Sequence, residues 1–156
     1  MNRNTTATLN ACGEHYVAAY LSRKELIVAL PSAHIPGTDL FVSAPSGGRP
    51  IRVQVKTGTQ STSNDKVEGP IYLWATSAAI TQLIDEQMWF AFVWLKSWPE
   101  DLPEIFFVPQ SVVSDCMSTQ TDSSYPSFWM RTEVAESYRG EQGYRKLREA
   151  LAETAP

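Results

Sequence analysis

An acid, an amide and a lysine stand close together in segment 36–57 of the chain. Asp39 precedes Gln54 by fifteen positions, and Lys56 lies two positions beyond Gln54. A carboxylate, an amide oxygen and a backbone carbonyl such as that of Val55 are oxygen ligands that a hard divalent cation accepts. A neighbouring lysine can orient an attacking water or stabilise charge that develops on a phosphate. These residue types and spacings suit metal-assisted hydrolysis of a phosphodiester bond.

Two expected strands would bring these side chains together. Residues 51–57 alternate strictly between apolar and polar side chains, so one face of that strand carries Arg52, Gln54 and Lys56. Residues 38–43 form the strand before it, and the Gly-rich turn at 44–50 is typical of a hairpin. Pairing of the two strands as a hairpin places Asp39 alongside the end of the later strand, near Gln54.

A helix that carries Glu14 is expected just before these strands. Apolar residues recur at helical spacing across residues 7–24, namely at Leu9, Cys12, Tyr16, Val17, Tyr20 and Leu21. At roughly 100° per residue, Glu14 lies at the border of this apolar arc, on the side of Val17 and Leu21. A glutamate that faced plain solvent would lie on the opposite side. Glu14 is therefore a candidate to complete a metal site, directly or through water.

The remaining pattern predicts a mixed sheet between helices. Further strands are expected at 26–30, 71–76, 88–95 and 104–108, and further helices at 78–87, 110–117 and 141–152. Residues 88–95 are apolar throughout, which is typical of a strand buried on both faces. Polar segments at 58–69 and 118–127 are expected to be loops. This order of elements indicates an α/β/α sandwich around a small mixed sheet.

Length and composition favour a single domain spanning residues 1–156. With 43% hydrophobic residues among 156, the chain is large enough for a real core. No apolar run is long enough to span a bilayer, and the N-terminus lacks the apolar stretch of a signal peptide. We therefore expect no membrane association and a cytoplasmic location, with Cys12 and Cys116 as ordinary reduced thiols.

The net charge of −4 argues against a broad, non-specific binder of nucleic acid, which normally presents a basic surface. It does not exclude a nuclease, because acidic metal ligands lower the total charge while a cleft needs only local positive charge. Four basic residues cluster in sequence near the candidate site, namely Arg49, Arg52, Lys56 and Lys66.

Other residues of functional types have simpler interpretations. Surface or satisfied positions are expected for the two histidines, His15 and His34. Two tryptophans of the apolar run are expected in the core, Trp89 and Trp94, whereas two others stay open as base-stacking candidates, Trp74 and Trp98. Basic residues near the C-terminus are diluted by glutamates, so we expect a solvated helix face at Arg139, Arg145, Lys146 and Arg148.

Three segments carry a family resemblance: GEHYVAAYL at 13–21, PGTDLFV at 36–42 and IRVQVKT at 51–57. Together they resemble the PD-(D/E)XK nuclease superfamily, also called the restriction-endonuclease-like fold. The resemblance is to the branch in which Gln-x-Lys replaces Glu-x-Lys. The later FAFVWL and IFFVP strands also resemble small stand-alone members. The resemblance covers a core of about residues 8–115, with about 116–156 as a C-terminal helical extension.

The resemblance implies a metal-dependent nuclease that uses Mg²⁺ or Mn²⁺ and acts on DNA. It implies that Asp39, Gln54 and the Val55 carbonyl bind the metal, that Lys56 is catalytic and that Glu14 is an accessory acid and ligand. Gln54 departs from the main pattern because it is neutral. The site then has one negative charge fewer, and its metal affinity is expected to be weaker unless Glu14 compensates.

Two alternatives to a self-sufficient nuclease stay open. The first is a catalytically inactive module that keeps the nuclease fold as a binding or assembly subunit. The acidic composition, the neutral Gln54 and the absence of a separate DNA-recognition domain favour it. The second is a nuclease subunit that works as a homodimer or with a partner protein, because cutting two strands requires two sites.

Overall fold

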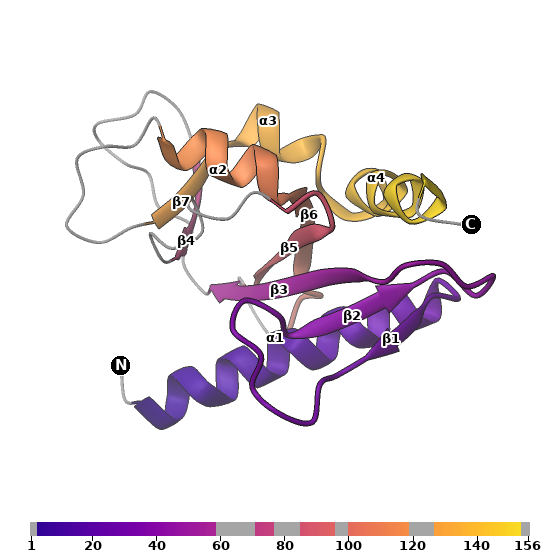
Figure 1. Ribbon diagram of the computed structural model, residues 1–156. Helices are drawn as coiled ribbons and strands as arrows, with labels where there is room; N and C mark the ends of the chain where they lie inside the picture. The colour runs from indigo at the N-terminus through magenta and orange to yellow at the C-terminus, as the bar shows by residue number, and fades with distance from the viewer. Residues whose placement is uncertain (1–2, 59–70, 77–84, 96–99, 119–126, 154–156) are drawn as a thin grey trace.

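The computed structural model describes residues 3–58, 71–76, 85–95, 100–118 and 127–153 (Figure 1). The elements run in the order α1 (Arg3–Arg23), β1 (Ile27–Ala29), β2 (Leu40–Ser43), β3 (Ile51–Gly58), β4 (Ile71–Ala75), β5 (Met88–Trp94), β6 (Glu104–Pro109), α2 (Gln110–Ser118), β7 (Ser127–Arg131), α3 (Thr132–Glu136) and α4 (Gly140–Glu153). Most of the expected helices and strands form, with small shifts of their ends.

The central sheet has five strands in the order β1-β2-β3-β5-β6. Neighbouring strands pair antiparallel except β3 and β5, which pair in parallel. β4 and β7 form a separate antiparallel pair. The sheet is therefore mixed, as the sequence predicted. On the side away from β2, β3 pairs with β5 and not with β4, the next strand in the chain.

Two hydrophobic cores lie on opposite faces of this sheet. α1 and α4 cover one face, where Val17 and Leu147 pack with Val53 of β3. α2, α3 and the β4–β7 pair cover the other face, where Trp74 and Phe128 pack with residues of β5 and β6. In Figure 1, α1 lies below the sheet, and α2, α3, β4 and β7 lie above it. The expected α/β/α sandwich is confirmed.

β5 contributes to both cores, as its unbroken apolar sequence predicted. All seven of its residues are buried. One core takes Trp89, Ala91 and Val93. The other takes Met88, Phe90, Phe92 and Trp94. The strand thus lies in the middle of the molecule, and it fixes the position of its parallel neighbour β3.

Three features of the chain differ from expectation. The sequence pattern did not predict β7 or α3. Residues 78–84 of the expected helix 78–87 lie outside the described residues, and the end of that prediction is wrong because residues 85–87 are not helical. There the Asp85 side chain accepts a hydrogen bond from the Gln87 N–H at 2.9 Å, and Met88 N–H donates to the Asp85 carbonyl at 2.9 Å, which makes a turn into β5.

The C-terminal end of α1 is closed by a Schellman motif. The Leu26 N–H donates to the Leu21 carbonyl at 3.2 Å, and the Glu25 N–H donates to the Ser22 carbonyl at 3.0 Å. Glu25 therefore has a positive φ of 65°, at a position where glycine is the usual residue.

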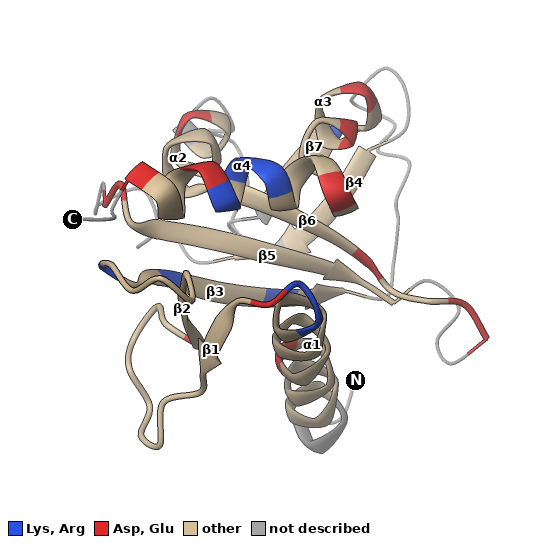
Figure 2. Cartoon of the chain, turned by 90° about the vertical axis from the view of Figure 1, so that its right-hand side faces the viewer, with Lys and Arg blue, Asp and Glu red and all other residues tan. Residues whose placement is uncertain are grey.

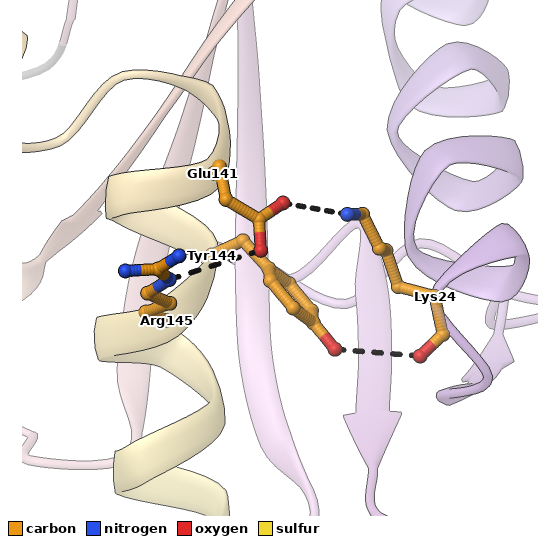
Figure 3. A network of polar contacts seen from close by, with 4 residues as sticks. All are labelled: Lys24, Glu141, Tyr144 and Arg145. Atoms are coloured by element: carbon orange, nitrogen blue, oxygen red, sulfur yellow. Dashed lines mark hydrogen bonds and ion pairs between the residues drawn. The ribbon is translucent and has the colours of Figure 1, made fainter.

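Helices α1 and α4 are joined at one corner of the molecule (Figure 3). Lys24 Nζ lies 2.5 Å from Glu141 Oε2, and the Tyr144 hydroxyl donates to the Lys24 carbonyl at 3.3 Å. Arg145 lies on the far side of Glu141, at 3.9 Å. These contacts tie the helix that carries Glu14 to the helix that covers β6.

Within the described ranges, no helix has both the length and the apolar character that a membrane crossing requires. Within the described residues, Cys12 and Cys116 are not joined in a disulfide. Figure 2 shows acidic and basic residues interspersed along α4. The exposed basic residues of that helix, Arg145, Lys146 and Arg148, lie among acids, as a solvated face requires.

Candidate active site

The start of β2 places Asp39 against the middle of β3. Leu40 pairs with Val53 in the antiparallel register, so Asp39 lies across from Gln54. The Asp39 N–H donates to the Val53 carbonyl at 2.9 Å, and the Val55 N–H donates to Oδ2 of Asp39 at 2.7 Å. The predicted hairpin is therefore confirmed, and the carboxylate of Asp39 is held beside the Gln54–Lys56 segment.

A glycine pair makes this hairpin possible. Gly47 and Gly48 adopt φ values of 91° and 109°, which side chains with a Cβ rarely tolerate. The chain can therefore reverse between β2 and β3 in the register that sets Asp39 opposite Gln54.

Strand β3 presents its polar residues on one side, as its alternation predicted. Ile51, Val53 and Val55 are buried in the core beneath α1. In the parallel register, Gln54 pairs with Phe90 and Lys56 pairs with Phe92. Paired residues of adjacent strands point to the same face. Gln54 and Lys56 therefore emerge beside the second core, and both are partly buried.

Glu14 of α1 belongs to the same electrostatic neighbourhood. Partial burial raises the pKa of Glu14, and the nearby carboxylate of Asp39 raises it further. The positive charges of His15 and Lys56 act in the opposite direction. The charges of side chains from β3 and from the residue before β2 thus act on a side chain of α1. An added cation would relieve the cost of placing two carboxylates there.

Contact between α1 and β3 fixes this region. Gly13 is buried, and a Cβ added to it would lie 2.0 Å from Oγ1 of Thr57. Glu14 follows Gly13, and Lys56 precedes Thr57. Sequence reasoning missed this contact. The available signal was a glycine inside a helical pattern, which usually has a packing reason.

The three charged residues of the site have no ion-pair partner within the described part of the chain: Glu14, Asp39 and Lys56. The charges of Asp39 and Lys56 nevertheless act on the pKa of Glu14. No carboxylate of the described residues lies within 4.0 Å of the Lys56 ammonium.

Arg52 has a different role from the local cation that its sequence position indicated. Its guanidinium pairs with Asp85 at the turn before β5. The pKa of Asp85 is lowered, first by the N–H of Gln87 and then by Arg52 and Arg49. The pair joins the start of β3 to the start of β5. Lys66, the fourth basic residue of the expected cluster, lies outside the described residues.

The other sequence candidates are exposed histidines or, among the described tryptophans named above, core residues. His15 and His34 are exposed. Trp74, Trp89 and Trp94 are all at most 9% exposed. Trp74 Nε1 donates to the Val93 carbonyl at 3.2 Å, so the Trp74 ring is a core element rather than a base-stacking surface. Trp98 is not among the described residues.

The candidate metal ligands at and near Asp39 are all oxygen atoms, which suits a hard divalent cation. Across the described ranges, no group of three or more His, Cys, Asp or Glu residues could hold a metal. The metal prediction for this region therefore depends on two carboxylates, Glu14 and Asp39, together with the amide of Gln54 and the carbonyl of Val55.

Comparison with known proteins adds evidence at the level of the fold. No family model and no curated protein sequence matches the chain. Among solved structures, a bacterial homing endonuclease, I-Ssp6803I, superposes with a TM-score of 0.55 at 13% sequence identity. The match covers 96% of this chain and 93% of that one. The chain has an endonuclease-like fold. At this identity the likeness is one of fold alone, and it does not distinguish the PD-(D/E)XK branch.

Proposed function

We propose that this chain is a divalent-metal-dependent endonuclease that hydrolyses phosphodiester bonds of DNA. The observation that carries the proposal is the hairpin that holds the Asp39 carboxylate against Val55 and across from Gln54. Glu14 of α1 and Lys56 of β3 are near enough for the charges of Asp39 and Lys56 to act on Glu14. Two acids and a lysine beside a strand hairpin form a set that can hold a cation next to a phosphate. The likeness in fold to a homing endonuclease supports both the reaction and the choice of DNA.

Each residue has a proposed role that follows from its chemistry. The side chains of Asp39, Gln54 and Glu14 and the carbonyl of Val55 would hold Mg²⁺ or Mn²⁺, since all four are hard oxygen donors. Such an ion polarises the phosphate and lowers the pKa of a bound water. Lys56 orients the attacking water or stabilises the negative charge that develops on the phosphate oxygens.

Among the described residues of the expected basic cluster, Arg52 is paired with Asp85 and Arg49 also acts on the charge of Asp85. Because the chain carries a net charge of −4, attraction to the DNA backbone is expected to depend on Lys56 and on the metal itself. We also infer that residues 1–156 act as one domain in the cytoplasm, where the thiols of Cys12 and Cys116 stay reduced.

The proposal is tested by incubating the protein with plasmid, linear duplex, single-stranded and branched DNA in the presence of Mg²⁺ or Mn²⁺. We expect cleavage of at least one substrate, its loss on adding EDTA, and its loss in Lys56→Ala. Lys146→Ala is the matched control, because Lys146 is an exposed lysine on α4. Absence of cleavage on every substrate, or full activity of Lys56→Ala, contradicts the proposal. The same panel with RNA separates the two nucleic acids.

A second candidate function is a non-catalytic binding or assembly subunit. Strand β1 is an edge of the central sheet. Ile27 on that strand is 55% exposed and Leu30 just after it is 45% exposed. An apolar sheet edge favours contact with a second copy or a partner protein. The neutral Gln54 is compatible with a site that no longer needs a metal.

Calorimetric titration with Mn²⁺ separates the two candidates. Binding that disappears in Asp39→Ala supports the nuclease. Absence of binding, together with a dimer in light scattering that Ile27→Lys dissociates, supports the assembly subunit.

A further inference from the structure

The backbone of α1 lies against the Thr57 side chain at Gly13. A Cβ built on Gly13 would lie 2.0 Å from Oγ1, 3.1 Å from Cβ and 3.2 Å from Cγ2 of Thr57. Contacts below about 3 Å between such atoms are strongly repulsive, so any side chain at position 13 would push α1 and β3 apart or distort Thr57. Figure 1 shows α1 crossing beneath β3.

The local conformation of α1 does not require a glycine at position 13. Gly13 lies in the interior of a helix of 21 residues, where glycine is less favourable than alanine. It has helical geometry and no positive φ that would require glycine. The close approach to Thr57 is therefore the feature that explains this residue.

Each residue of the Gly13–Thr57 contact is bonded to a residue of the proposed active site. Glu14 follows Gly13 and Lys56 precedes Thr57, so the separation of the two backbones here determines how near Glu14 comes to Asp39 and Lys56. We propose that Gly13 is a positioning residue, whose missing side chain lets α1 dock closely enough on β3 to bring the Glu14 carboxylate into the site. The catalytic meaning of this inference rests on the proposed function, but the geometry does not.

Thr57 offers a way to relieve the contact selectively. It is β-branched, and both branches face Gly13, so rotation about χ1 exchanges one for the other. Its hydroxyl is buried and lacks a hydrogen-bond partner among the described residues. Replacing Thr57 by alanine removes Oγ1, which makes the 2.0 Å contact, and Cγ2, and leaves the Cβ at 3.1 Å. Because the lost hydroxyl makes no hydrogen bond to a described residue, the change has little effect on the rest of the structure.

The experiment compares Gly13→Ala, Thr57→Ala and the double variant Gly13→Ala/Thr57→Ala in the full chain. The separation of the Glu14 and Asp39 carboxylates is measured in crystal structures without metal, and Mn²⁺ affinity is measured by calorimetry. In Gly13→Ala we expect the two carboxylates to move apart, because the added methyl group separates α1 from β3. We also expect Mn²⁺ to bind about tenfold more weakly, as for other changes that misplace a ligand. The double variant should restore both quantities toward their native values.

Gly143→Ala is the matched control. Gly143 lies in α4, and a Cβ there would lie 2.0 Å from the Tyr138 carbonyl oxygen. The change inserts the same methyl group into an equally tight contact away from Glu14. It should lower the unfolding temperature while leaving the separation of the Glu14 and Asp39 carboxylates and Mn²⁺ binding unchanged.

The inference is overturned if Gly13→Ala leaves the separation of the Glu14 and Asp39 carboxylates unchanged, or if Gly143→Ala changes it as much. Should Gly13→Ala fail to fold, the double variant decides. The inference then requires a folded double variant in which this separation is close to the native one, and an unfolded variant or one with the carboxylates far apart overturns it. Failure of the proposed function is recognised separately, because it appears as a native chain that neither binds Mn²⁺ nor cleaves DNA.

Discussion

Glu14 is more costly to ionise in the folded protein than in solution. Burial and the charge of Asp39 raise its pKa, and His15 and Lys56 only partly offset them. Because the folded-state pKa lies above the unfolded value, the contribution of Glu14 to stability is fully present below about pH 4.5 and is lost as the pH rises through the folded pKa. Ionisation of Glu14 therefore lowers the stability of the metal-free fold at neutral pH, as expected for a carboxylate that serves as a metal ligand.

Glu14→Gln should stabilise the metal-free protein at pH 8 and leave its stability nearly unchanged at pH 4. Glutamine resembles the protonated acid, so it avoids the ionisation that native Glu14 undergoes between these pH values. Urea unfolding in EDTA at the two pH values measures the effect. Glu149→Gln, on the exposed face of α4, is the control and should show no comparable difference. A less stable Glu14→Gln protein at pH 8 would contradict the prediction.

Gln54 limits the charge of the site. Gln54→Glu adds a carboxylate across from Asp39, so Mn²⁺ should bind at least about tenfold more tightly. The metal-free variant should be less stable than native, because a third carboxylate joins Glu14 and Asp39. Calorimetry and thermal unfolding with and without Mn²⁺ measure both effects. Unchanged affinity would show that residue 54 does not face the metal.

At the scale of the element, the end of α1 contains a conformation that its residue does not favour. Glu25 has a φ of 65° in the Schellman motif, and a left-handed conformation costs a residue with a Cβ roughly 1–2 kcal/mol. Glu25→Gly should therefore stabilise the protein by about 0.5–1 kcal/mol, after allowance for the greater freedom of glycine in the unfolded chain. Chemical denaturation measures it. Glu25→Ala keeps the Cβ and should bring no such gain.

Elements were predictable where the sequence carries a local signature. The alternation of Ile51, Val53 and Val55 identified β3, and the glycine pair in the turn identified the hairpin that positions Asp39. Strand β7 was missed because it follows a polar segment and is defined by pairing with β4, more than fifty residues earlier. Asp85 turned the end of an expected helix into a turn through a side-chain hydrogen bond that no periodicity reveals.

The candidate site also has a part that the sequence could predict and a part that it could not. Asp39, Gln54 and Lys56 could be placed together from strand geometry, since they belong to one hairpin. The approach of α1 to β3 at Gly13 and the capture of Arg52 by Asp85 are tertiary contacts. These contacts depend on how the helices and the sheet pack on one another rather than on residue spacing, so they could not be predicted from the sequence pattern.

At the scale of the whole molecule, metal binding should be coupled to stability. A ligand that binds the folded state alone stabilises it by about 2.7 kcal/mol at a concentration of one hundred times Kd. Mn²⁺ should therefore raise the unfolding temperature, and Asp39→Asn should abolish the rise. Differential scanning calorimetry across a Mn²⁺ series measures it. An equal rise in Asp39→Asn would place the binding elsewhere in the molecule.

The parallel pairing of β3 with β5 also bears on how the chain reaches this fold. β1, β2 and β3 follow one another in the chain and can pair early. β5 is separated from β3 by a long connection, so its pairing with β3 requires a larger loop to close and is expected to form later. Until then, its sequence MWFAFVW is exposed without a single charge to discourage self-association. Refolding should therefore compete with aggregation, and its yield should fall as the protein concentration rises. The strand that is fully buried in the folded protein is thus the segment expected to promote aggregation while the protein folds.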